Sequence, residues 1–197
     1  MAFWATPLTR DSGDPKRKFR FTVQFDGLDF GEGIIWFAKS VGKPEITVTE
    51  AEHTFLDKKY YYPGRVEWNT VTFTLVDPAD VSKDQDAVRQ MNTLIEAAGY
   101  KIPKSPNGPG SLETMSKGKS SASLSTIVIN QINAEGVTIE SWTLNNPFIK
   151  SAKFGELDYT GDELVELSLE VRYDWATCSI LDSAGNLVEF YSLQEQD

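Results

Sequence analysis

The sequence has one cysteine, Cys178, and one histidine, His53, among its 197 residues. A single cysteine cannot form an intramolecular disulfide, so the fold does not depend on an oxidising compartment, and we expect Cys178 to be a buried, inert thiol. A single histidine leaves almost no material for a histidine-rich metal site or a histidine-based hydrolytic triad. We therefore expect His53 to be a turn or interface residue.

Sequence motifs of common catalytic and binding sites are also missing. Gly-x-Ser-x-Gly, Cys-x-x-Cys and the EF-hand spacing do not occur. Gly118-Lys119-Ser120 has the form of the end of a phosphate-binding loop, but Glu113 stands where that loop requires glycine. We predict a protein that is not an enzyme and that has no cofactor and no metal site.

Long apolar runs and excess positive charge are absent as well. No window approaches the ~20 apolar residues that span a bilayer, and the N-terminal residues lack the pattern of a signal peptide. We therefore expect a soluble protein without membrane insertion. Nineteen basic residues stand against 29 acidic ones, a formal net charge of -10. Such a charge repels a phosphate backbone, so we do not expect specific binding of nucleic acid.

Short segments with the alternation of β-strands make up most of the chain. From Phe19 to Phe25, apolar and polar residues alternate with the period of a half-buried strand. The other predicted strands cover 34–38, 46–52, 55–62, 68–76, 124–132, 137–144, 148–154, 164–175, 179–181 and 187–191. We count about ten strands and one helix. This predicts a mainly β fold, an antiparallel β-sandwich or barrel, in a single domain over residues 1–197.

One segment has helical periodicity instead. Its apolar residues gather on one face and predict a helix over about 81–98, with Asp80 or Ser82 as cap and Gly99 as C-terminal stop. It is the only substantial helix that we predict. The remaining segments are an N-terminal arm at 1–18, a flexible loop rich in proline, glycine and serine at 101–123, and a C-terminal hairpin extension at 177–197.

Candidate contact residues are the large aromatic side chains. Tyr60, Tyr61 and Tyr62 are consecutive, so adjacent rings lie on opposite faces of a strand and at least one is expected outside the core. With Phe3, Trp4 and Phe55 they are candidate inter-subunit anchors, because large rings bury much area at little entropic cost. The alternative is that they complete the core of the domain itself.

Charge is distributed unevenly along the chain. Basic residues occur near the N-terminus, at Lys16, Arg17, Lys18 and Arg20. Acidic residues occur late, at Glu156, Asp158, Asp162, Glu163, Glu166 and Glu170. We interpret the acidic set as a solvated or lumen-facing stripe rather than a glycosidase pair. Opposite charge at two ends would suit head-to-tail association of identical subunits.

The order of these segments resembles that of a known family. A short arm and the 19–25 strand are followed by a connection at 39–44 into two long strands and then by Pro63-Gly64. Next come a strand at 68–76 containing Thr-Val-Thr-Phe-Thr, a helix ending in Ala-Ala-Gly and a closing strand ending in Tyr-Asp-Trp. Over residues 8–176 this resembles the tail tube proteins of contractile-tailed bacteriophages, the T4 tube protein family, which is related to the tubes of R-type pyocins and type VI secretion systems. The 101–123 loop and the segment after Trp175 depart from the family pattern.

The resemblance implies an architecture and a set of partners. Subunits would form hexameric rings whose sheets join into one continuous β-barrel around a lumen, and the rings would stack into a tube that delivers DNA into the host cell. The hairpin at 45–62 would protrude to an adjacent ring, and Glu163, Glu166 and Glu170 would line the lumen. Sheath, tape-measure and baseplate proteins would be partners, and DNA would pass without specific binding. The location would be the virion tail, assembled in the bacterial cytoplasm.

Other functions are compatible with the same residues. The chain could be the tube or tube initiator of a phage-derived contractile injection system. In a different class, it could be a monomeric carbohydrate-binding sandwich that stacks sugars on Trp36, Trp68 or the tyrosines. A carboxylate glycosidase would depend on Glu163 or Glu166.

Overall fold

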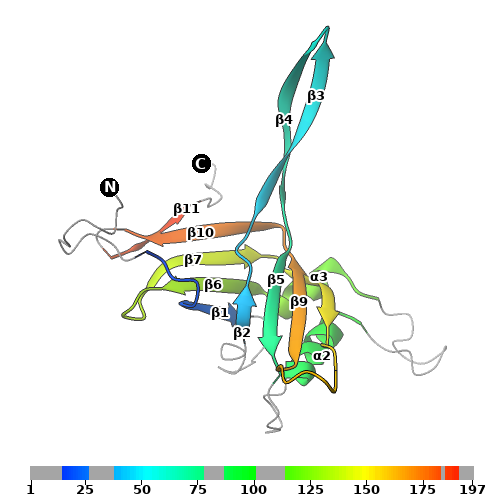
Figure 1. The fold of residues 1–197 in the computed structure, drawn as a ribbon, viewed down its shortest axis with the longest axis vertical. Helices are drawn as coiled ribbons and strands as arrows, with labels where there is room; N and C mark the ends of the chain where they lie inside the picture. The colour runs from blue at the N-terminus through cyan, green and yellow to red at the C-terminus, as the bar shows by residue number, and fades with distance from the viewer. Residues whose placement is uncertain (1–14, 27–37, 78–86, 101–113, 183–184, 191–197) are drawn as a thin grey trace.

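The computed structural model describes residues 15–26, 38–77, 87–100, 114–182 and 185–190. The predicted fold class is confirmed, because antiparallel strands dominate and helices are few. The described strands form three sheets, and none of them closes into a barrel within this part of the single chain. Figure 1 shows two sheets and the helices grouped in a body from which the third sheet projects as a long hairpin.

The first sheet of the body has five strands in the order β1-β6-β7-β10-β11. They are β1 (Phe21–Phe25), β6 (Thr126–Ile132), β7 (Thr138–Asn145), β10 (Trp175–Leu181) and β11 (Leu187–Phe190). A turn at 133–136 joins β6 and β7. Asn133 Oδ1 accepts hydrogen bonds from the backbone N–H groups of Glu135 and Val137 at 3.0 and 2.8 Å, and Gly136 has a φ of 80°. This turn sets the register of the central strand pair.

The second sheet has four strands in the order β2-β5-β9-β8. They are β2 (Ala38–Val41), β5 (Val71–Val76), β9 (Glu166–Arg172) and β8 (Phe148–Lys153). Alternation along β5 and β9 gives this sheet an apolar face and a polar face. The apolar face packs on the five-stranded sheet.

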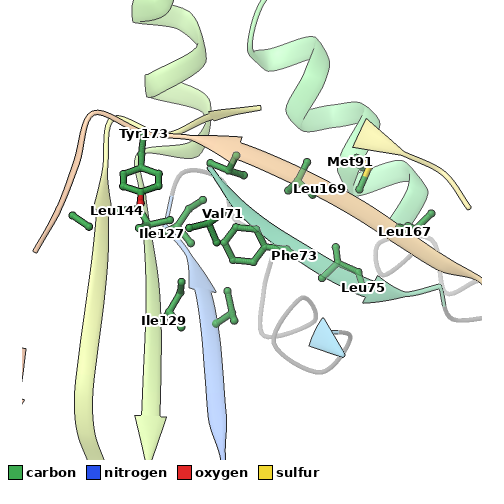
Figure 2. Packing of buried hydrophobic residues seen from close by; sticks show 13 residues of the cluster. Val71, Phe73, Leu75, Met91, Ile127, Ile129, Leu144, Leu167, Leu169 and Tyr173 are labelled. Atoms are coloured by element: carbon green, nitrogen blue, oxygen red, sulfur yellow. The ribbon is translucent and has the colours of Figure 1, made fainter. Parts of the chain in front are cut away.

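The core lies between these two sheets and also receives Met91 from a helix (Figure 2). Phe73 is completely buried and its ring centroid lies 5.5 Å from that of Phe25 on the other sheet. The remaining buried members of the core are Val23, Val71, Leu75, Ile127, Ile129, Leu144, Leu167, Leu169, Val171, Tyr173 and Ala176. Burial of this apolar area is the main force that stabilises the body.

Two predicted strand boundaries are wrong. The strand predicted at 164–175 is divided, because the chain leaves the four-stranded sheet after Arg172 and enters the five-stranded sheet at Trp175. Asp174 stabilises the crossing by accepting hydrogen bonds from Lys117 Nζ at 2.7 Å and Asn146 Nδ2 at 3.1 Å. Because β10 pairs with β7 along most of its length, the 177–197 segment begins as part of the sheet and not as a separate extension.

The 39–44 segment is the other boundary error. It was predicted as a connection, yet β2 forms there and pairs with β5. Of the strand predicted at 34–38, only Ala38 belongs to the described residues. β2 is short and contains Lys39 and Ser40, so its own sequence gives little strand signal and pairing with β5 determines its conformation.

Helix α2 (Ala87–Ala97) confirms the described part of the predicted helix, and Gly99 adopts a φ of +104° at its C-terminal end, as expected for a stop. The predicted start at 81–86 and the caps Asp80 and Ser82 lie outside the described residues. The prediction of a flexible loop at 101–123 is wrong from Lys117 onward, because α3 (Lys117–Leu124) forms there. For the same reason the prediction of only one substantial helix is wrong. The Ser116 side chain caps α3 by accepting from the backbone N–H of Lys119 at 3.3 Å.

Candidate assembly surfaces

A long exposed element of the structure is the hairpin of β3 (Ile46–Phe55) and β4 (Lys58–Trp68), whose strands pair with each other and with no other strand of the described residues. All ten residues of β3 are exposed, as is every residue of β4 except Trp68. The hairpin therefore extends beyond the end predicted at Tyr62, and both of its faces are exposed to solvent. A two-stranded sheet that buries so little apolar area is marginally stable in water, so this element gains stability from any surface that covers it.

A β-bulge divides the hairpin into a root next to the body and a tip. Between Val48 and Glu50 the register shifts, and Pro63 lies at this point, where a missing N–H is tolerated. Thr49 Oγ1 accepts a hydrogen bond from Arg65 N at 2.8 Å. A Cβ at Gly64 would clash with Thr49 Oγ1 and would lie 2.9 Å from the Thr49 carbonyl oxygen, so this close approach of the strands requires glycine. The Pro63-Gly64 pair thus forms a bulge within β4 and does not end it.

The predicted aromatic anchors are exposed on this hairpin. Tyr60, Tyr61, Tyr62 and Phe55 are 47, 57, 57 and 61% exposed. The alternative that these rings complete the core of their own domain is therefore wrong. Their role as inter-subunit anchors remains a prediction. Phe3 and Trp4, the other two proposed anchors, lie outside the described residues.

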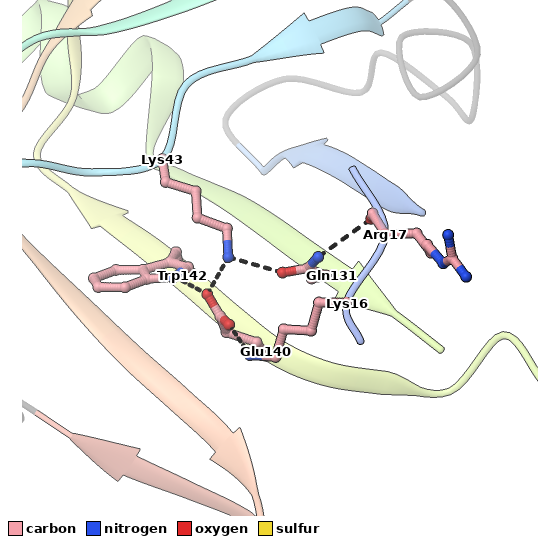
Figure 3. Close-up of polar contacts among 6 residues, drawn as sticks. All are labelled: Lys16, Arg17, Lys43, Gln131, Glu140 and Trp142. Carbon is pink, nitrogen blue, oxygen red and sulfur yellow. Dashed lines mark hydrogen bonds and ion pairs between the residues drawn. The ribbon is translucent and has the colours of Figure 1, made fainter. Parts of the chain in front are cut away.

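The connection that enters the hairpin is bound to the body by a buried carboxylate, Glu140 of β7 (Figure 3). Its side chain is only 9% exposed and accepts hydrogen bonds from Lys16 Nζ, from Lys43 Nζ at 2.5 Å and from Trp142 Nε1 at 2.6 Å. Lys43 Nζ also donates to Gln131 Oε1 at 2.8 Å. Burial alone would raise the pKa of Glu140, but the hydrogen bonds from the two lysines and Trp142 outweigh it and lower the pKa to about 2.

This cluster brings together three distant segments of the chain. Lys16 belongs to the described end of the N-terminal arm, Lys43 to the connection that enters β3, and Glu140 to the five-stranded sheet. Our sequence reasoning missed it. The available signal was the position of Glu140 in the alternation of β7, in phase with Trp142 and the buried Leu144.

Cys178 and two carboxylates of the predicted acidic stripe also lie in the described residues. Cys178 is buried, as predicted, and burial followed by the Glu140 charge raises the pKa of its thiol. On β9, Glu166 pairs with Lys39. Glu170 accepts from Lys150 Nζ and Thr70 Oγ1, both at 2.8 Å, and these bonds lower its pKa.

The acidic stripe is thus partly neutralised on the outer face of the four-stranded sheet. Glu163 is exposed just before β9. Whether Glu163, Glu166 and Glu170 face a lumen remains a prediction.

The edges of the body sheets form a further surface. In the described part of the chain, β1 and β11 bound the five-stranded sheet, and β2 and β8 bound the four-stranded sheet, each paired on one side only. Such edges present backbone N–H and C=O groups that can pair with another chain. β11 adds exposed apolar side chains, with Val188 and Phe190 at 42 and 48% exposure.

Chemical sites are scarce in the described ranges. Across residues 15–26, 38–77, 87–100, 114–182 and 185–190, histidine, cysteine and carboxylate side chains do not gather into a group that could hold a metal ion. The helices of the same ranges are all too short or too polar to cross a membrane.

Comparison with known proteins gives matches by fold and not by sequence. No protein-family model and no curated protein matches the chain. A chain of the anti-feeding prophage tube-terminating cap matches with a TM-score of 0.58 at 18% identity, over 91% of this chain and 99% of that chain. A chain of the anti-feeding prophage baseplate matches with a TM-score of 0.58 at 13% identity, over 84 and 96%. A chain of the PVC extracellular contractile injection system sheath-tube complex matches with a TM-score of 0.53 at 17% identity, over 84 and 92%. The chain has the fold of these components over almost its whole length.

Proposed function

We propose that this chain is a structural subunit of the tube of a contractile tail or tail-like particle, in which identical copies form hexameric rings that stack. The observation that carries the proposal is the solvent-exposed β3–β4 hairpin on a body whose sheets, in the described residues, end in strands that are paired on one side only. Both features are costly in a monomer and are stabilised when neighbouring copies cover them. The likeness to components of tube-cap and sheath-tube assemblies supports this choice over a carbohydrate-binding sandwich or a glycosidase.

The finer form of the proposal is a bacteriophage tail tube that conducts DNA. Sheets of neighbouring subunits join edge to edge into one barrel, which removes the open edges. The polar face of the four-stranded sheet lines the lumen, where Glu163, Glu166 and Glu170 keep DNA from adhering. The partners are other copies, the sheath, the tape-measure protein and the baseplate, and the location is the virion tail.

Electron microscopy of the purified full-length chain, alone and with a baseplate initiator complex, tests the proposal. We expect six-fold rings, and stacked tubes at high concentration. Monomers that persist at high concentration even with the initiator present would contradict it. The finer form is tested on particles that contain the tube. A phage tail tube is recovered on particles that carry DNA, whereas the tube of an injection system is not.

A second candidate is a tube-initiating or tube-terminating subunit of a contractile injection system. The likeness to chains from a baseplate and from a terminating cap favours it. Such a subunit forms one ring at the end of a tube built from another protein. Rings that never stack by themselves, but bind tube ends, would support this candidate over the first.

A further inference from the structure

The register of the β3–β4 hairpin determines which side chains share a face. Directly opposed residues of an antiparallel pair point to the same side, and successive residues alternate. At the root, Val48 is opposite Val66 and Ile46 is opposite Trp68. Ile46, Val48 and Val66 are 46, 49 and 59% exposed, whereas Trp68 packs against Tyr173 with ring centroids 5.9 Å apart. One face of the root is therefore an apolar continuation of the core.

Beyond the bulge, this face of the hairpin no longer carries mainly apolar side chains. β3 carries no inserted residue there, so Val48 is followed on the same face by Glu50, Glu52 and Thr54. The ion pair of Lys59 Nζ with Glu52 Oε1 at 2.9 Å agrees with this assignment, because both belong to that face. The apolar face of the root is thus a charged face at the tip.

The opposite face of the tip, which we call the tip face, contains aromatic side chains. Its opposed pairs are Ala51 with Tyr62, His53 with Tyr60, and Phe55 with Lys58. Lys58 gives it positive charge, while Glu50 and Glu52 lie on the other side. The tip face therefore fits an acidic surface that also exposes apolar side chains.

The chain itself has such a surface at the other end of the molecule. The segment between β8 and β9 exposes Leu157, Tyr159 and Leu164, at 85, 109 and 70%. Acidic residues lie between and beside them, at Glu156, Asp158 and Asp162. In Figure 1 this segment is the golden loop at the lower end of the body, and the hairpin tip lies at the opposite end of the longest axis.

We infer that the tip face of one copy docks on the 154–164 segment of the copy in the next ring, and this rests on the function proposed above. The two surfaces differ and lie at opposite poles, so their contact is heterologous and repeats along one direction without closing, as stacking requires. Apolar burial supplies the affinity, and Lys58 against the acidic residues fixes the orientation.

The test uses paired variants of the full-length chain, examined by electron microscopy and native mass spectrometry. We expect Tyr60→Ser/Tyr62→Ser to form rings but at least tenfold fewer tubes, and Leu157→Ser/Tyr159→Ser to do the same. Tyr61→Ser is the matched control, because its ring lies on the other face, and we expect it to form tubes like the wild type. Mixing the two double variants should give pairs of rings, since each supplies the surface that the other lacks.

Several outcomes would overturn the inference. These are normal tubes from either double variant, loss of tubes in Tyr61→Ser, or failure of the mixture to form ring pairs. They differ from failure of the proposed function, in which the wild-type chain itself forms neither rings nor tubes.

Discussion

The two-layered body and the β3–β4 hairpin are built from the same kind of alternating strand but differ in what covers them. In the body, Val71 and Phe73 are 1 and 0% exposed, because a second sheet covers their face. In the hairpin, Val48 and Val66 are 49 and 59% exposed. Burial of apolar area is what stabilises a fold. The body therefore has in a single copy the apolar burial that stabilises a fold, and the hairpin has little of it.

Truncation of one aromatic ring in each region should give the largest difference in stability between the body and the hairpin. We expect Phe73→Ala to lower the free energy of unfolding by about 3–5 kcal/mol, since it leaves a cavity in a closed core. Phe55→Ala should change it by no more than about 0.5 kcal/mol, since the ring is already in solvent. Denaturant unfolding of dilute protein measures both. Similar costs in the two variants would show that the hairpin folds as part of the core.

The attachment between the two regions gives the next largest effect. Glu140→Gln removes the charge that two lysines and Trp142 bind, and hydrogen bonds to a charged group are worth about 1.5–3 kcal/mol. Because both lysine side chains are about half exposed, we expect a loss of about 2 kcal/mol. Glu163→Gln, at an exposed position, is the control and should be neutral. Thermal unfolding of both variants would reveal equal stability if the cluster contributes nothing.

The contribution of Glu140 to stability should also depend on pH. The pKa of Glu140 is lowered to about 2 in the folded chain, below the value of about 4.3 expected when unfolded. The folded state therefore binds fewer protons, and this stabilisation is complete above about pH 5 and is lost as the pH falls toward 2. We expect the wild type to lose more stability than Glu140→Gln across that range. Parallel curves for the two proteins would contradict the assignment.

A substitution at the bulge tests whether the hairpin can change without the body. We expect Gly64→Ala to destabilise the hairpin locally by about 1 kcal/mol, because the new Cβ must displace the Thr49 side chain and backbone. Gly161→Ala is the control, since no atom lies within 4 Å of its added Cβ. Hydrogen exchange should quicken at hairpin amides only. Faster exchange throughout the body would mean that the two regions are coupled.

The smallest effect is expected on the outer face of the four-stranded sheet. Lys150→Ala removes the ion pair with Glu170, and exposed ion pairs contribute little to the free energy of unfolding because solvent screens them. We expect a barely measurable loss of stability, and a still smaller one in high salt. Unfolding at two salt concentrations measures it. A large, salt-independent loss would show that this face is more enclosed than the structure indicates.

Much of the body could be predicted from the sequence because its strands have one covered face. Phe73 and its neighbours in β5 alternate clearly, and so do the residues of β6, β7 and β9. α3 could not be predicted from periodicity, since its sequence Lys-Gly-Lys-Ser-Ser-Ala-Ser-Leu has little apolar pattern. Only Ser116 as a cap marked its start.

Tertiary pairing explains the remaining differences. β2 is recognisable only by its partner β5, and the strand predicted at 164–175 divides because its two halves find partners in different sheets. The run of three tyrosines did indicate the exposed hairpin, because three adjacent rings cannot all face one core. Glu140 was missed because a buried carboxylate depends on lysines that are distant in sequence.

The Glu140 cluster also has a mechanical meaning. Force applied at the hairpin tip acts on a long lever. Trp68 holds the hairpin by packing against Tyr173 at the core, and Lys43 holds the connection before β3 by pairing with Glu140. Two fixed points resist tilting, whereas one would act as a pivot. Load applied to the hairpin would therefore be shared between the apolar core and the five-stranded sheet.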